Sequence, residues 1–203
     1  MSALAFLSPA ASDGAIARSP MERLAQQSGA RFEVRDGWNV AVDYDGARSD
    51  AVSWADVSHL RKFERRGVGV PGEFERAVRD GDRWVCRLTE TRTLVIGGEE
   101  TREDAIDVTC NYAALTILGP RAREVIARFC ALDLRPPQAP PHSFRPGSIG
   151  RQPGMLLVEA EDRFLLLFGW ATAEYMWTVV ADAARPLGGA PAGIEAIEAL
   201  PDA

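Results

Sequence analysis

The stretch from Asp107 to Cys130 reads DVTCNYAALTILGPRAREVIARFC, and we expect the rest of the chain to be organised around it. Its middle, AALTIL (113–118), is mostly apolar on both faces of a strand, as in a sheet that is covered on both sides. Gly119-Pro120 ends the strand, and Pro120 suits the first position of a helix, where its missing N–H is not needed. Apolar residues then recur at helical spacing, at Ala122, Val125, Ile126 and Phe129. The stretch therefore predicts an interior strand, a tight corner and a helix over 120–130 that packs on the sheet.

Composition and charge exclude several classes of protein. A chain of 203 residues can bury a full core. Its net charge of −6, with no basic run to offset it, argues against a nucleic-acid partner. No apolar stretch approaches the ~20 residues that a membrane span needs, so no membrane partner is expected. Cys86, Cys110 and Cys130 are odd in number and lack metal-like spacing, which favours a reduced, cytoplasmic location and no metal.

The N-terminal part of the chain predicts a helix followed by a pair of strands. Residues 1–18 are rich in small residues and predict a flexible arm, without the basic start of a signal peptide. Ser19-Pro20 predicts the start of a short helix that Gly29 ends. Residues 30–46, ARFEVRDGWNVAVDYDG, predict two strands joined by a turn at Asp36-Gly37.

The middle of the chain predicts a second group of short elements. The segment from Pro71 to Gly81 predicts a short helix, because Glu73, Phe74, Ala77 and Val78 follow helical spacing. Alternation at Trp84, Cys86 and Leu88 predicts a strand, and residues 93–96 predict another strand before a Gly97-Gly98 turn. The charged run from Glu99 to Asp104 predicts a solvated helical turn.

The C-terminal part predicts a hairpin and a closing helix. Five prolines within residues 131–147 predict an extended connection that is neither a helix nor a central strand. Residues 148–158 predict a strand, Glu159–Asp162 a hairpin tip, and residues 163–168 a returning strand buried on both faces. A helix over residues 173–184 follows. Residues 189–203, rich in Gly, Pro and Ala, predict a mobile tail.

Several of these segments, in this order, resemble the folate-binding core of the glycine-cleavage T-protein (aminomethyltransferase) family, which includes the small gamma subunit of heterotetrameric sarcosine oxidase. The matching segments are SPMERL (19–24), GARFEV (29–34), DGW (36–38), ADVSHL (55–60) with KFE (62–64), and LGPRA (118–122). Cys130, Asp133, Leu134 and Pro136 also match the order C-x-x-D-L-x-P of gamma-subunit relatives. The resemblance covers about residues 19 to 188.

The resemblance implies an α+β fold of two ferredoxin-like lobes, with mostly antiparallel sheet and helices. It also implies that the C-terminal barrel domain of full T-proteins is lacking. On this interpretation residues 1–18 form a flexible arm, residues 19–188 the T-protein-like folate-binding domain, and residues 189–203 a mobile tail.

The resemblance further implies a pocket for tetrahydrofolate lined by Asp56, Ser58 and His59. Trp84 or Trp170 would be a stacking wall for a flat ring. Glu161 is placed on the glutamate that holds the pterin ring in catalytic relatives. From the residues alone, Asp56 can equally cap a turn, His59 can be a hydrogen-bonded core residue, and Glu161 can be a surface acid.

The sequence departs from the catalytic members of the family in two segments. Their glycine-rich segment with paired aspartates has no counterpart in this chain. Asp80 and Asp82 flank Gly81, but they lie in a polar turn and lack the two glycines and the aliphatic residues of that segment. Their Y-T-G-E hairpin is replaced by VEAED (158–162), which keeps neither the tyrosine nor the glycine.

Two functions are therefore compatible with the resemblance. In the first, the chain is a non-catalytic, gamma-type subunit of a sarcosine-oxidase-like demethylase in one-carbon and N-methyl amine metabolism. Its partners would be larger flavin- or folate-dependent subunits, docked on the proline-rich segment through Leu134, His142, Phe144 and Arg145. In the second, it is a free-standing tetrahydrofolate-binding, aminomethyltransferase-like enzyme that handles a one-carbon unit.

Overall fold

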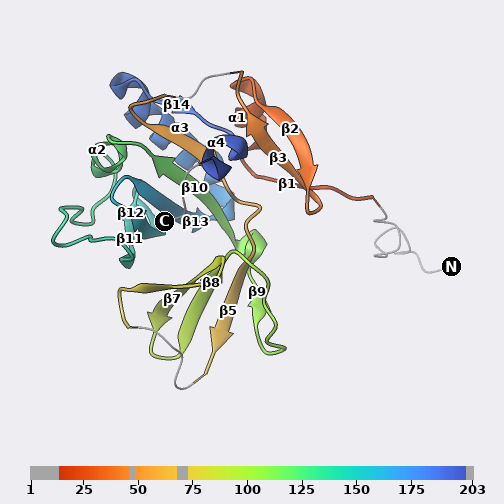
Figure 1. The fold of residues 1–203 in the computed structure, drawn as a ribbon, viewed down its shortest axis with the longest axis vertical. Coiled ribbons are helices and arrows are strands. Elements are labelled where there is room, and N and C mark those ends of the chain that lie inside the picture. The colour runs from red at the N-terminus through yellow and green to blue at the C-terminus, as the bar shows by residue number, and fades with distance from the viewer. Residues whose placement is uncertain (1–13, 46–48, 68–72, 200–203) are drawn as a thin grey trace.

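A computed structural model describes residues 14–45, 49–67 and 73–199, and it is a strand-rich mixed α+β fold with three sheets. The largest sheet has six strands, in the order β11 (Phe144–Ile149), β12 (Gln152–Ala160), β13 (Arg163–Gly169), β10 (Tyr112–Leu118), β4 (Ser53–Asp56) and β14 (Ala190–Pro191). Helices α2 (Ala122–Ala127) and α3 (Ala173–Ala184) pack against each other and contact this sheet (Figure 1).

The centre of the six-stranded sheet is the antiparallel pair β10 and β13, in which Ile117 lies opposite Phe164 and Leu115 opposite Leu166. Ala113, Leu115 and Ile117 join a core cluster with the helices, whereas Ala114 joins a second cluster beneath the other face. The odd and even residues of one strand thus enter two separate cores. The prediction that residues 113–118 and 165–168 lie in the interior is confirmed.

The second sheet has five antiparallel strands, in the order β6 (Ala77–Asp80), β7 (Arg83–Thr89), β8 (Arg92–Ile96), β5 (Lys62–Arg66) and β9 (Ile106–Asp107). In Figure 1 it lies at the lower end of the molecule, away from the helices. Its residues Trp84, Cys86, Leu94 and Ile96 fill the second cluster together with Leu165 and Leu167 of β13.

The third sheet, β1 (Ala17–Arg18), β3 (Trp38–Asp43) and β2 (Arg31–Arg35), follows the N-terminal prediction closely. Helix α1 (Glu22–Gln27) begins just after Ser19, whose Oγ accepts a hydrogen bond from the Met21 N–H, and it ends before Gly29 at φ 86°. Asp36 and Gly37 have φ values of 50° and 78°, as a two-residue hairpin turn requires.

Two predicted helical segments are not helical. The segment expected to be a helix from Pro71 to Gly81 instead contains β6, and its first two residues lie outside the described part. Phe74 and Val78 produced the helical spacing, but they are 61% and 49% exposed and form no buried face. The run from Glu99 to Asp104 is irregular, with a turn at 103–104.

The strand predicted over 148–158 is two strands, β11 and β12, separated by Gly150 and Arg151, which both have positive φ. β11 is an edge strand, and an edge strand tolerates Pro146 because its missing backbone N–H is not needed to pair with a strand on both sides. The predicted hairpin tip, returning strand and closing helix are confirmed, with α3 spanning Ala173–Ala184. The helix after Gly119 is shorter than predicted and begins at Ala122.

The two ends of the chain contain elements that the sequence did not predict. Residues 17–18 of the expected arm form β1, and residues 1–13 lie outside the described part. Within the expected tail, β14 pairs with β4, and α4 (Ile194–Glu198) contacts β3. Short 3-10 helices also occur in the described part of the chain, at Thr109–Asn111, Trp170–Thr172 and Arg185–Leu187.

The architecture is therefore mixed α+β as predicted, but its strands form three sheets, and α2 and α3 lie with the six-stranded one. Gly119 explains the corner after β10. It has φ 116°, and a Cβ there would lie 2.8 Å from the carbonyl oxygen of Ala51, so a larger residue would meet backbone.

Replacing Ile117 by alanine tests the central position of β10. Ile117 is fully buried between Trp54 of β4 and Phe164 of β13, so Ile117→Ala should lower the free energy of unfolding by about 2–5 kcal/mol. Val34→Ala, at a side chain that is 57% exposed, should change it by no more than about 0.5 kcal/mol. Equal, small losses in denaturant melts of the two variants would show that β10 is not an interior strand.

Candidate functional site

The candidate site lies where β4 ends and the chain leaves the six-stranded sheet. Here the Val57 N–H still donates to the Ala114 carbonyl at 3.0 Å, and the Ala114 N–H donates to Ser58 Oγ at 3.1 Å. Ser58 thus extends the contact with β10 through its side chain after regular pairing has stopped. The hydrogen bonds of Val57 and Ser58 fix the positions of Asp56 and His59, which flank this pair of residues in the chain.

Asp56 is a buried carboxylate with both oxygens engaged. Ser19 Oγ donates a hydrogen bond to Asp56 Oδ2, and the Ser58 N–H donates to Oδ1 at 2.9 Å. Burial raises the pKa of Asp56, while the hydrogen bonds from Ser19 and Ser58 act in the opposite direction. Asp56 therefore caps the turn after β4 and ties it to the residues that precede α1.

Lys62 is a fully buried residue of this site that sequence reasoning did not identify. Its Nζ donates to the carbonyl oxygens of Ser58 at 2.9 Å and Leu60 at 2.7 Å. Burial lowers the pKa of Lys62 to about 8, and the negative charge of Asp56 partly offsets this. No local pattern predicts the burial of Lys62, because a lysine at the start of a strand is normally solvated.

His59 lines a narrow cleft together with Asp56. The cleft is lined by Ser19, Phe32, Trp38, Asn39, Val40, Ala41, Asp56 and His59. Burial lowers the pKa of His59 to about 4, with a smaller effect from Lys62, so its imidazole is neutral at pH 7. The cleft has a volume of about 10 Å³, which is room for about one water molecule. A pterin ring does not fit there in this conformation.

Trp170 approaches the cleft through Trp38. The two rings lie 6.1 Å apart between centroids and are tilted by 60°, so Trp170 packs on a tryptophan that lines the cleft. Trp38 thus links Trp170 to the cleft that Asp56 and His59 line. Ser58 is linked to the same cleft by its hydrogen bond to Asp56.

Trp84 has a different set of neighbours. It is buried in β7, and its Nε1–H donates to Glu159 Oε1 at 3.0 Å. The ring of His142 meets it edge-on at 5.1 Å, and the guanidinium of Arg79 lies 5.0 Å from its centroid. Trp84 is 3% exposed, so little of its ring is open for stacking with a ligand.

Glu159, rather than Glu161, is the enclosed acid of the β12–β13 hairpin. Glu161 lies exposed at the turn between the two strands. The Glu159 side chain is 16% exposed, lies 3.9 Å from Arg163, and has its pKa raised by burial. The order V-E-A-E-D contains both acids, and the end of β12 at Ala160 distinguishes them, because Glu159 lies in the strand and Glu161 in the turn.

The predicted docking surface on the proline-rich segment is wrong for two of its four residues. Phe144 is fully buried in the second core cluster, and Leu134 is buried in the first. Arg145 and His142 remain partly exposed. Phe144, which was expected to contact a partner, is part of the core instead.

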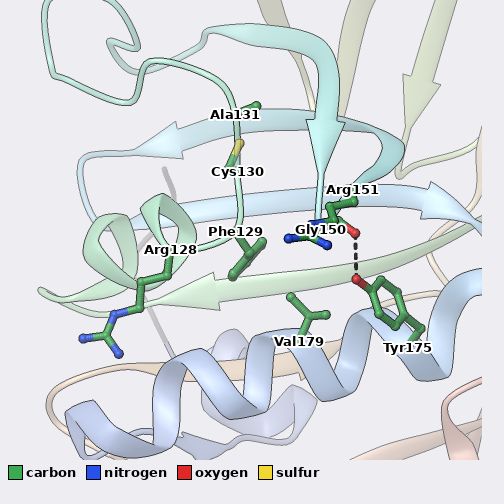
Figure 2. Close-up of a pocket in the computed structure, with 8 residues that line it drawn as sticks. All are labelled: Arg128, Phe129, Cys130, Ala131, Gly150, Arg151, Tyr175 and Val179. Atoms are coloured by element: carbon green, nitrogen blue, oxygen red, sulfur yellow. Dashed lines mark hydrogen bonds between the residues drawn. The ribbon is translucent and has the colours of Figure 1, made fainter.

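A separate hollow of about 320 Å³ lies between α2, the β11–β12 turn and α3 (Figure 2). Tyr175 donates its hydroxyl hydrogen to the Gly150 carbonyl at 2.9 Å at one side of it. Cys130 also lines it, but burial raises the pKa of this thiol, which makes it a weak nucleophile at pH 7. This hollow contains no arrangement of acid, base and nucleophile.

Two features are absent from the described residues. Among them, no three His, Cys, Asp or Glu side chains are grouped as a metal site. Likewise, no described helix is both long and apolar enough to cross a membrane.

The lowered pKa of Lys62 predicts a specific dependence of stability on pH. Between pH 8 and its ordinary value of 10.5, Lys62 is protonated in the unfolded chain and largely neutral in the folded one, so stability rises with pH. The unfolding free energy of the wild type minus that of Lys62→Met should rise by about 3 kcal/mol across this window. Denaturant melts of both proteins at pH 7.5, 9 and 10.5 measure it. A flat or falling difference would mean that Lys62 is solvated.

Comparison with known proteins gives similarity at the level of structure. No family model matches the sequence, and no curated protein matches it. A chain of the heterotetrameric sarcosine oxidase from Corynebacterium sp. U-96, in complex with pyrrole 2-carboxylate, superposes with a TM-score of 0.67 and 19% identity over 85% of this chain and 97% of that one. The glycine cleavage system aminomethyltransferase T from Bartonella henselae superposes with a TM-score of 0.68 and 15% identity over 89% of this chain.

The present chain spans 60% of the length of that aminomethyltransferase, whereas it spans nearly all of the sarcosine oxidase chain. The strand-rich α+β architecture of this chain is thus similar to the fold of both proteins.

Proposed function

We propose that this chain is a non-catalytic, gamma-type subunit of a sarcosine-oxidase-like demethylase, in one-carbon and N-methyl amine metabolism. The observation that carries the proposal is its match to almost the whole length of one sarcosine oxidase chain. Its partners would be larger flavin- or folate-dependent subunits. Residues 19–188 would form the truncated T-protein-like domain, without the barrel of full T-proteins.

The geometry after β4 supports a structural role for the segment that most resembles the family. Both oxygens of Asp56 accept hydrogen bonds from within the chain, and Lys62 is occupied by two backbone carbonyls. Each carboxylate oxygen can accept a second hydrogen bond, so binding of a ligand by Asp56 would depend on open space beside it. The cleft beside Asp56 has room for about one water molecule, so these residues act mainly as a brace for the turn.

A second candidate is a free-standing enzyme that binds tetrahydrofolate. The observation that favours it is the grouping of Asp56, Ser58 and His59, which the resemblance assigns to a folate pocket, with Trp38 and Trp170 as flat side chains beside them. For this function the cleft would have to open by movement of the Ser19 or Trp38 side. Glu161 and Trp84 would then contribute only if such a movement brought them to the same pocket.

We further propose a cytoplasmic location. Cys86, Cys110 and Cys130 are all free thiols, and a reducing compartment maintains that state.

Calorimetry with tetrahydrofolate separates the two functions. If the turn after β4 is a brace, the isolated protein should bind tetrahydrofolate with a Kd weaker than about 1 mM, because the cleft is filled by its own side chains. Glu161→Gln, at the exposed hairpin turn, should leave the titration unchanged.

Binding tighter than this, weakened about tenfold in His59→Gln, would contradict the subunit proposal and favour the free-standing enzyme. Glu103→Gln is then the matched control, since Glu103 is an exposed acid that does not line the cleft.

A further inference from the structure

Another hollow lies beside β6, at one edge of the five-stranded sheet. It has a volume of about 630 Å³ and is lined by Glu73, Arg76, Ala77, Val78, Arg79 and His142. β6 is the edge strand of this sheet, and its first residue, Ala77, donates a hydrogen bond to the His142 carbonyl, so the hollow lies where β6 meets the segment before β11. Its volume lies in the range of sites for small organic molecules.

The two guanidinium groups of this hollow are available for a ligand. Among the described residues, neither Arg76 nor Arg79 forms an ion pair or a hydrogen bond through its side chain. The other acid nearby, Glu75, lies 4.0 Å from Arg145 instead. Two arginines beside one hollow form a site for an anion, because each guanidinium can donate two parallel hydrogen bonds to a carboxylate.

The position of Arg79 is fixed by the residues beneath it. Its guanidinium lies over the Trp84 ring at 5.0 Å, and Trp84 is held by its hydrogen bond to Glu159 and by the edge of His142. A cation whose position is set in advance loses less entropy when a ligand binds. Arg79 is therefore a better anchor than a freely mobile surface arginine.

The backbone beside the hollow has an unusual conformation at two residues. Glu75 and His142 have φ values of 61° and 66°, a region that residues other than glycine rarely adopt. Hydrogen bonds from the Ala77 N–H to the His142 carbonyl at 2.8 Å, and from the Phe144 N–H to the Glu75 carbonyl at 3.0 Å, hold the two segments together. Such strain is often retained where a binding site requires it.

We propose that this hollow binds a small organic carboxylate, with Arg76 and Arg79 as the cations that pair with it. The half-exposed side chain of Val78 supplies apolar contact for the body of the ligand, which an inorganic anion would not use. Glu73 opposes binding by its charge. This site does not depend on the proposed subunit function, and it shares no lining residue with the cleft beside Asp56.

Benzoate is a suitable probe, because it combines one carboxylate with a flat apolar body. The Trp84 indole N–H, assigned by comparison with Trp84→Phe, reports on the site in ¹⁵N-correlated NMR spectra. Benzoate should shift this signal saturably, with a Kd of about 10 mM or tighter. Benzamide, its neutral analogue, should not produce a saturable shift, and inorganic phosphate should bind more weakly than benzoate.

Charge variants then test the assignment of the cations. Arg76→Gln should weaken benzoate binding about fivefold, and Arg79→Gln by at least as much. Glu73→Gln should strengthen it about twofold, because it removes the opposing charge. Arg121→Gln is the matched control for net charge, as Arg121 pairs with Glu124 outside the hollow, and its Kd should match that of the wild type.

The proposal is overturned if benzoate gives no saturable shift, if benzamide or phosphate binds as well as benzoate, or if Arg76→Gln and Arg121→Gln have the same Kd. Arg79 also packs on Trp84, so its variant is interpreted only when the remaining amide signals match those of the wild type. Arg76, which is exposed, gives the test without that condition.

Discussion

The structure depends on the pairing of β10 with β13 in a sheet that is apolar on both faces. Alternate residues of these two strands enter different cores, one beneath α2 and α3 and the other shared with the five-stranded sheet. A sheet of this kind is stable only if both faces are covered, so the positions of the helices and of the second sheet follow from it. The corner at Gly119 then returns the chain as α2 over one face, at a point where backbone of Ala51 leaves no space for a side chain.

The same constraint accounts for the polar residues at the end of β4. Where the strand stops beside the buried sheet, its backbone groups and the charges of Asp56 and Lys62 are still enclosed by protein. Unpaired buried polar groups are costly, and here each finds a partner, Asp56 in Ser19 and Ser58, and Lys62 in two carbonyls. A segment that looks like a ligand site in the sequence can therefore be retained for the stability of a buried turn.

The parts of the fold that the sequence predicted are those with a strong local pattern. Residues 113–118 are apolar on both faces, Asp36-Gly37 is a strong turn signal, and α3 has a continuous helical period, and all three were predicted correctly. The segment before Gly81 was mistaken for a helix, because exposed residues such as Phe74 and Val78 can imitate helical spacing. The elements at the tail were missed, since β14 and α4 depend on contacts with β4 and β3 that are distant in sequence.

The candidate site was predictable only in part. The resemblance pointed to Asp56, Ser58 and His59, and these do lie together, but burial of Lys62 and the closure of the cleft depend on packing from the N-terminal sheet. Glu159 and Glu161 differ because β12 ends at Ala160, which leaves Glu161 in the turn, and the sequence does not determine where the strand ends. Phe144 was assigned to a docking surface because it lies in the proline-rich segment beside Arg145, yet it begins β11 and fills the core.

We propose that this chain functions as one subunit of a larger assembly. The mass of the native protein from its own cells tests this, by size-exclusion chromatography with light scattering and absorbance at the flavin wavelengths. We expect elution far above the mass of a 203-residue chain, in a single peak with flavin absorbance and larger subunits. Elution as a lone monomer that turns over an N-methyl amine with added tetrahydrofolate would contradict it.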